Sequence, residues 1–287
     1  MEVGKQAKTL RNMMNGGKKT AVRALTITSG KGGVGKTNVV TNLAMGLQSK
    51  DKSVLVFDAD MGLGNVDILL GLAPKFNLQD VLSGKKSIEE IIVEGPGGIN
   101  ILPATSGVQE LTQLDKESRL VLVEELDRIS AQYDFLLFDT GAGISSNVTY
   151  FCCAAQHIVL IVTAEPTSLT DAYALIKVLH QKHNQKRFRI IVNTIKSEKE
   201  AKEIFRHLSI VTDRFLNSIS LEYQGHILYD LNVQKAVRQQ KPFLEAYPYS
   251  KVSRCIYDLC DSLIIENYSS SEESEGTFFW SNVFPMS

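Results

Sequence analysis

Short apolar runs recur along the middle of the chain, separated by stretches that carry apolar residues at helical spacing. The runs are rich in Val, Ile, Leu and Phe, and they occupy residues 24–28, 53–57, 99–102, 134–138, 158–162 and 188–192, with a weaker one near 216–221. Because they lack the alternation of apolar and polar residues that marks a half-exposed strand, they predict strands buried on both faces. The helical stretches cover residues 38–48, 116–129, 169–180 and 198–207.

This alternation of strands and helices predicts the fold class. It is typical of an α/β protein with a doubly wound, mainly parallel sheet flanked by helices, in which ligands bind at the carboxyl ends of the strands. The chain has 287 residues, of which 44% are hydrophobic, so its length permits one large or two ordinary domains. The pattern favours one domain over residues 21–266. No apolar run approaches the roughly 20 residues that a membrane-spanning helix needs.

Charge is balanced over the whole chain but not along it. Lys and Arg number 31 and Asp and Glu number 32, for a net charge of -1, which argues against a non-specific nucleic-acid-binding protein. Residues 1–20 are basic, residues 267–287 are acidic without Lys or Arg, and we expect both segments to be flexible appendages. The four cysteines have neither the spacing of a zinc site nor a C-x-x-C motif. We expect them to be reduced thiols, as in cytosolic proteins.

A glycine-rich segment follows the first predicted strand and leads into the first predicted helix. It runs from Gly30 to Thr37 and fits the pattern G-x-x-x-x-G-K-[ST], in which backbone N–H groups and the start of a helix surround phosphate oxygens. Lys36 is expected to reach the β- and γ-phosphates of a nucleotide, and the Thr37 hydroxyl to ligate Mg²⁺. The predicted nucleotide-binding residues of this segment are Gly30, Gly32, Gly33, Val34, Gly35, Lys36, Thr37 and Asn38.

Polar residues also follow three other predicted strands. Asp58 and Asp60 follow the second strand, Asp139 follows the fourth, and Asn193 follows the sixth. Because the carboxyl ends of parallel strands share one edge of a sheet, we expect these side chains near the glycine-rich segment. Aspartates in such positions can hold an attacking water or the Mg²⁺ shell, and Asp139 is expected to accept a hydrogen bond from a Mg²⁺-bound water.

A second lysine, Lys31, stands directly after the first glycine of the segment, where it has no role within its own site. The resulting Lys-Gly-Gly-Val-Gly-Lys-Thr form resembles the deviant Walker A motif of the MinD/ParA ATPases, and the resemblance extends over residues 21 to about 265. It implies an ATPase that uses ATP/ADP and Mg²⁺ and forms an ATP-dependent homodimer. In that dimer Lys31 would reach the partner's nucleotide, and Lys31, Lys36 and Asp60 would be the catalytic residues.

The resemblance also implies roles for the residues at the strand ends. Asp60 would position the attacking water, and Asp58 would bind nucleotide and support the Mg²⁺ shell together with Thr37 and Asp139. Gly143 would lie in a nucleotide-contacting switch loop that responds to the γ-phosphate.

Three further residues are matched to the family. Glu165 would contact nucleotide across the dimer, and Asp171 would pair with Lys31. Asn193 would hold the adenine, because its side-chain amide offers both a donor and an acceptor to the base edge.

Within this family the chain most resembles the FlhG/FleN subgroup, whose members control flagellar number. Near the N-terminus Gln6, Ala7, Leu10 and Arg11 match an element with which that subgroup binds the SRP-type GTPase FlhF and stimulates its GTP hydrolysis. Lys5 stands where the subgroup has aspartate. A flagellar transcription activator or a switch-complex protein is implied as a further partner.

The C-terminal segment carries large apolar residues at helical spacing. MinD and FlhG end in an amphipathic helix that binds membranes when dimerisation presents two copies, and two copies can gain on the order of 10² to 10⁴ in avidity. The resemblance therefore implies a cytoplasmic protein that associates reversibly with the inner face of the cytoplasmic membrane. The alternative is a terminus packed against the body, because acidic residues repel anionic lipid. The expected membrane-facing residues are Phe278, Phe279, Trp280, Val283 and Phe284.

Two other interpretations share the phosphate loop. A ParA- or MinD-type ATPase could position another cargo, such as DNA or a division regulator, but a DNA-binding protein of this kind needs a basic surface. An iron–sulfur scaffold needs paired cysteines at a dimer axis, which the cysteine spacing does not obviously supply.

Overall fold

The computed structural model describes residues 22–60, 66–103, 116–216, 218–265 and 280. The predicted N-terminal segment and most of the predicted C-terminal segment therefore lie outside the described residues. Within them no helix is long and apolar enough to cross a membrane.

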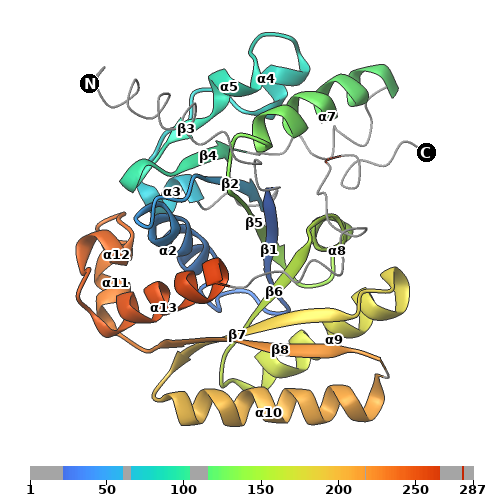
Figure 1. The fold of residues 1–287 in the computed structure, drawn as a ribbon, viewed down its shortest axis with the longest axis vertical. Coiled ribbons are helices and arrows are strands. Elements are labelled where there is room, and N and C mark those ends of the chain that lie inside the picture. The colour runs from blue at the N-terminus through green and yellow to red at the C-terminus, as the bar shows by residue number, and fades with distance from the viewer. Residues whose placement is uncertain (1–21, 61–65, 104–115, 217, 266–279, 281–287) are drawn as a thin grey trace.

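The described strands form one sheet in the order β3-β4-β2-β5-β1-β6-β7-β8 (Figure 1). Neighbouring strands are parallel except β3 and β4, which are antiparallel. Strands β2 to β5 lie on one side of β1, and strands β6 to β8 lie on the other. The predicted doubly wound α/β fold is therefore confirmed. The strands are β1 (Arg23–Ser29), β2 (Val54–Ala59), β3 (Val93–Glu94), β4 (Asn100–Pro103), β5 (Phe135–Ala142), β6 (His157–Val162), β7 (Arg187–Ile195) and β8 (Ser220–Leu228).

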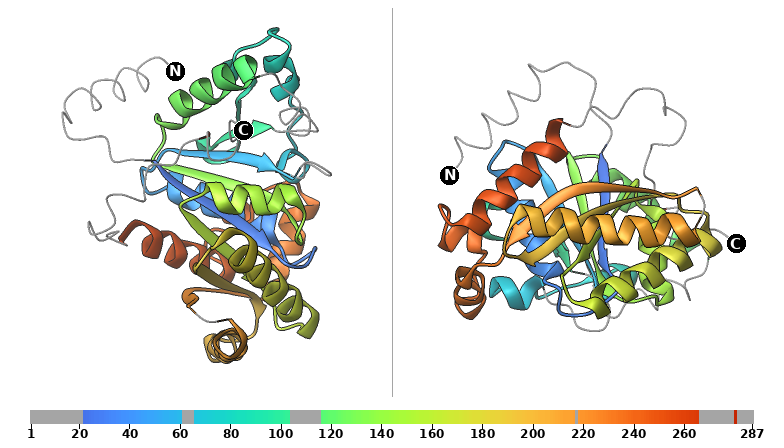
Figure 2. Two further views of the ribbon diagram at one scale, coloured as in Figure 1. Left: turned by 90° about the vertical axis from the view of Figure 1, so that its right-hand side faces the viewer. Right: turned by 90° about the horizontal axis from the view of Figure 1, so that it is seen from below.

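Helices cover both faces of the sheet (Figure 1), and the left view of Figure 2 shows α8 and α9 in front of the strands. One face carries α2 (Lys36–Gln48), α3 (Val66–Leu70), α11 (Leu231–Arg238), α12 (Phe243–Ala246) and α13 (Lys251–Ile265). The other carries α4 (Leu78–Leu82), α5 (Ile88–Ile91), α7 (Lys116–Ser130), α8 (Ser146–Ala154), α9 (Pro166–His183) and α10 (Glu198–Phe215). A short 3₁₀ turn, η1 (Pro96–Gly98), precedes β4.

The weak strand predicted near residues 216–221 is misplaced. Helix α10 continues through Phe215, and the Leu216 N–H donates to the Thr212 carbonyl oxygen at 2.8 Å as the helix ends. Leu216 is buried with the residues of α9 and α10, so its hydrophobicity reflects helix packing. The strand itself, β8, begins at Ser220.

Trp280 is fully buried between the sheet and α7. Its ring centroid lies 5.1 Å from that of Phe57 and 5.4 Å from that of Phe138. The indole N–H donates to Ser130 Oγ at 2.9 Å, and the backbone N–H donates to the Asp127 carboxylate at 2.8 Å. Trp280 is therefore part of the folded core in this structure, which matches the alternative of a terminus packed against the body, and its predicted contact with a membrane stays a prediction. Phe278, Phe279, Val283 and Phe284 lie outside the described residues.

Candidate functional site

The phosphate loop connects the carboxyl end of β1 to the start of α2. Gly33 and Gly35 have φ angles of 78° and 89°, a left-handed conformation that glycine adopts without the penalty of a Cβ atom. Gly35 is the residue before α2, and the helix has no acidic residue in its first turn. The positive end of the helix dipole is therefore available for a phosphate, and phosphate binding there stays a prediction.

The start of the loop is fixed to its neighbours. A Cβ atom on Gly30 would lie 2.2 Å from the backbone carbonyl carbon of Asp171, so only glycine fits between the loop and α9. The Gly143 N–H donates to the Ser29 carbonyl oxygen at 2.9 Å. The predicted switch loop thus contacts the end of β1, directly before the phosphate loop.

Lys36 and Asp139 form a buried ion pair, with 2.7 Å between Lys36 Nζ and Asp139 Oδ1. Burial raises the pKa of the Asp139 carboxyl, and the Lys36 ammonium opposes that rise. The second oxygen, Oδ2, is buried without a hydrogen-bond partner among the described residues. An oxygen of this kind is suited to accept a hydrogen bond from a Mg²⁺-bound water, as the sequence predicts for Asp139.

Asp58 lies directly across from Asp139, because the two residues are paired in the register of β2 and β5. Burial, followed by the charge of Asp139, raises the pKa of Asp58 to about 7. The Asp58 carboxylate accepts hydrogen bonds from the N–H groups of Asp60 and Val66 at 3.2 and 3.3 Å. The Asp60 side chain extends toward Gly141, because a Cβ atom added to Gly141 would lie 3.4 Å from Asp60 Oδ1.

These carboxylates fit a magnesium ion that is held largely by nucleotide. The described residues contain no group of three or more His, Cys, Asp or Glu side chains placed to hold a metal alone. Mg²⁺ is commonly bound through one or two carboxylates together with substrate phosphates and water. Thr37, Asp58 and Asp139 offer that set, and a cation there would oppose the charge of Asp139, which after burial raises the pKa of Asp58.

Lys31 contacts α9 of its own chain. Its ammonium meets the Glu165 carboxylate and donates to Thr167 Oγ at 2.9 Å. Asp171, the predicted partner of Lys31, instead contributes its backbone to the packing against Gly30. The predicted contacts of Glu165 and Asp171 across a dimer stay predictions.

Asn193 braces the phosphate loop, a contact that the sequence analysis missed. Its Nδ2 donates to the Val34 carbonyl oxygen at 2.7 Å, and its Oδ1 accepts from the Thr194 N–H at 2.8 Å. A Cβ atom on Gly35 would lie 2.6 Å from Asn193 Nδ2. Both ends of the amide are therefore occupied within the chain, although the predicted role was adenine binding.

Replacing Asn193 by alanine is expected to weaken binding of ATP and of inorganic triphosphate alike. The variant leaves the Val34 carbonyl without its donor, which costs about 1–3 kcal/mol for a buried group and corresponds to a roughly 5- to 150-fold weaker affinity. Isothermal titration calorimetry with both ligands tests this. A loss confined to ATP would show that Asn193 acts on the adenine and not on the loop.

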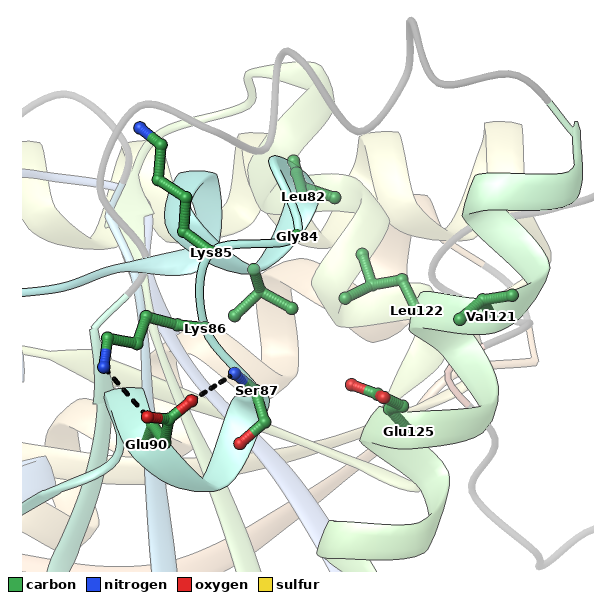
Figure 3. Close-up of a pocket in the computed structure, with 10 residues that line it drawn as sticks. Leu82, Gly84, Lys85, Lys86, Ser87, Glu90, Val121, Leu122 and Glu125 are labelled. Atoms are coloured by element: carbon green, nitrogen blue, oxygen red, sulfur yellow. Dashed lines mark hydrogen bonds and ion pairs between the residues drawn. The ribbon is translucent and has the colours of Figure 1, made fainter.

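A separate hollow of about 720 Å³ lies between α4, α5 and α7 (Figure 3). Lys86 and Glu90 form an ion pair at 2.8 Å on its rim. None of the predicted nucleotide-binding residues lines it, so it is distinct from the candidate site. Its walls consist of Val81, Leu82, Gly84, Lys85, Lys86, Ser87, Glu90, Val121, Leu122 and Glu125.

The remaining predictions concern cysteines and partners. All four cysteines are free thiols, and burial raises the pKa values of Cys152, Cys153, Cys255 and Cys260. Such thiols are suited to core packing.

The predicted partner-binding residues Gln6, Ala7, Leu10 and Arg11 lie outside the described residues.

Comparison with known proteins places the fold and the loop in a family. Residues 22–192 match the family described as AAA domain. The antiactivator FleN of Pseudomonas aeruginosa is 47% identical over 232 residues, which cover 81% of this chain and 82% of FleN. The flagellum site-determining protein YlxH of Helicobacter pylori is 32% identical over 266 residues, with 90% of each chain covered.

Solved structures agree with these relatives. A chain of the MinC:MinD cell division protein complex of Aquifex aeolicus matches with a TM-score of 0.68 and 29% identity, covering 85% of this chain and 96% of that one. MinD of Pyrococcus horikoshii, complexed with Mg-ADP, has the same fold, with a TM-score of 0.67 at 24% identity over 84% of this chain and 96% of that one. This chain therefore belongs to the MinD/ParA family of P-loop ATPases, in the group that includes FleN.

Proposed function

We propose that this protein is an ATP-driven dimerising switch that controls the number or placement of flagella. The observation that carries the proposal is Lys31 in the phosphate loop of a chain that is 47% identical to the antiactivator FleN. ATP binding brings two chains together, partners are recruited to the dimer, and hydrolysis releases them.

The residues of the site divide the work of hydrolysis. Lys36 and the loop N–H groups bind the phosphates. Thr37, Asp58 and Asp139 would hold Mg²⁺, which would neutralise phosphate charge. Asp60 orients the attacking water. Lys31 of each chain stabilises charge on the partner's nucleotide, a role that resembles that of an arginine finger.

The N-terminal segment stimulates GTP hydrolysis by an SRP-type GTPase of the FlhF kind, and through this GTPase the switch acts on flagella. A flagellar transcription activator or a switch-complex protein is a second partner. The protein acts in the cytoplasm and associates reversibly with the inner face of the cytoplasmic membrane, and this association does not use Trp280 while that side chain stays buried.

A peptide of residues 1–20 is expected to stimulate GTP hydrolysis by the FlhF-like GTPase of the same organism. The Gln6→Ala peptide should not stimulate, because the glutamine acts near the GTP site in the proposed complex. A Thr9→Ala peptide serves as the matched control and should retain stimulation. Released phosphate measures the rate. Equal rates with and without every peptide would contradict the FlhF part of the proposal and leave an ATPase with another cargo.

A further inference from the structure

Lys31 is held by two side chains at the start of α9. Glu165 is the residue before the helix, and its side chain accepts no capping hydrogen bond from the helix. It contacts the Lys31 ammonium instead, and Thr167 Oγ accepts a second hydrogen bond from that ammonium at 2.9 Å. The side chains of Lys31 and Glu165 are 36% and 63% exposed, so the pair lies where a second chain can reach it.

The backbone around Lys31 favours this contact. Gly30 packs directly against the Asp171 backbone of α9, and Ser29 Oγ donates to the Lys31 carbonyl oxygen at 2.9 Å. The base of the Lys31 side chain is therefore fixed beside the first turns of α9. Its ammonium then has an anionic and a neutral acceptor within reach.

We propose that Glu165 and Thr167 are positioning residues that hold Lys31 in its own chain until a partner's nucleotide competes for it. The inference rests on the proposed function, in which Lys31 acts across a dimer. A Lys31 ammonium that moves toward a phosphate of another chain gives up hydrogen bonds in its own chain, and the Glu165 carboxylate beside it would repel that phosphate. We therefore expect each chain to release this contact when the dimer forms. Glu165 and Thr167 thereby set the ATP concentration at which the switch closes.

The hold is weak enough to be reversible. Exposed ion pairs typically change an equilibrium by a factor of about two to five. Since a dimer breaks two such contacts, the factors multiply, and removing the hold should tighten ATP-dependent dimerisation by roughly four- to 25-fold.

The test compares Glu165→Gln and Thr167→Val with the wild-type chain by two measurements. The first is the rate at which an acetylating reagent modifies Lys31 in nucleotide-free protein, read by mass spectrometry. The second is the dimer dissociation constant with saturating ATP, read by analytical ultracentrifugation. Both variants should show acetylation of Lys31 about two- to five-fold faster and a tighter dimer. Glu198→Gln is the matched control, because Glu198 pairs with Lys202 at 2.7 Å and its side chain is about as exposed as that of Glu165.

Four outcomes would overturn the proposal. Unchanged acetylation of Lys31 in both variants would mean that the contact does not hold the ammonium. Faster acetylation of Lys31 with an unchanged dimer dissociation constant would show that Glu165 and Thr167 hold the ammonium but do not compete with dimer formation. A weaker dimer in Glu165→Gln alone would assign Glu165 to the partner's nucleotide. If no chain dimerises with ATP, the proposed switch and the competition fail together, and acetylation still decides whether Glu165 and Thr167 hold Lys31.

Discussion

Replacing Lys31 by alanine is expected to abolish ATP-dependent dimerisation and to lower the rate of ATP hydrolysis by roughly 10³- to 10⁵-fold, the range of cationic residues supplied across an interface. ATP binding itself should persist, because Lys36 and the loop N–H groups of the same chain remain. Phosphate release gives the rate and light scattering gives the mass. Lys202→Ala, on the exposed surface of α10, is the control and should behave like the wild-type chain.

The Asp60→Ala variant separates dimerisation from chemistry. Without the water-positioning carboxylate, hydrolysis should fall on the order of 10²- to 10⁴-fold, while the ATP-bound dimer should accumulate. Asp213→Ala, an exposed aspartate of α10, is the control. An Asp60→Ala chain that stays monomeric with ATP would contradict the role of Asp60 in positioning the attacking water. Likewise, a Lys31→Ala chain that hydrolyses ATP at the wild-type rate would contradict the role of Lys31 at the partner's nucleotide.

Replacing Trp280 by alanine is expected to lower the free energy of unfolding by about 3–5 kcal/mol, the usual cost of truncating a buried aromatic side chain. The change leaves a cavity beside Phe57 and Phe138 and removes the indole donor to Ser130. Urea denaturation followed by circular dichroism measures the loss.

Two variants calibrate this result. Trp280→Phe keeps a ring in the cluster but leaves the buried Ser130 hydroxyl without its donor, so a smaller loss of about 1–3 kcal/mol is expected. Tyr249→Ala, at a fully exposed aromatic position, should leave stability unchanged. If Trp280→Ala is as stable as the wild-type chain, the tryptophan does not contribute to the core.

Local patterns were enough to predict most of the sheet and the phosphate loop. The strand runs are continuous and buried, and the loop residues are adjacent in sequence, so each signal is contained in a short window. The strand prediction was wrong where an apolar residue is buried by helix packing and not by a strand. Leu216 caps the end of α10, so the strand predicted from residue 216 begins only at Ser220.

Contacts between distant segments could not be predicted in the same way. Asn193 and Val34 are separated by 159 positions, and Lys31 and Glu165 by 134. Their meeting depends on the order of strands in the sheet. Trp280 is a similar case, because an apolar residue near a chain end has the same sequence pattern whether it faces lipid or the rings of Phe57 and Phe138.

The position of Trp280 makes the chain its own optical probe. The sequence contains one tryptophan, so the intrinsic emission of the protein comes from a single ring that is seated among other aromatic rings in the core. Emission at short wavelength indicates that Trp280 is buried, and a shift to longer wavelength indicates that it is exposed to water. An ATP titration of unlabelled protein therefore records where this one residue lies at each stage of the nucleotide cycle.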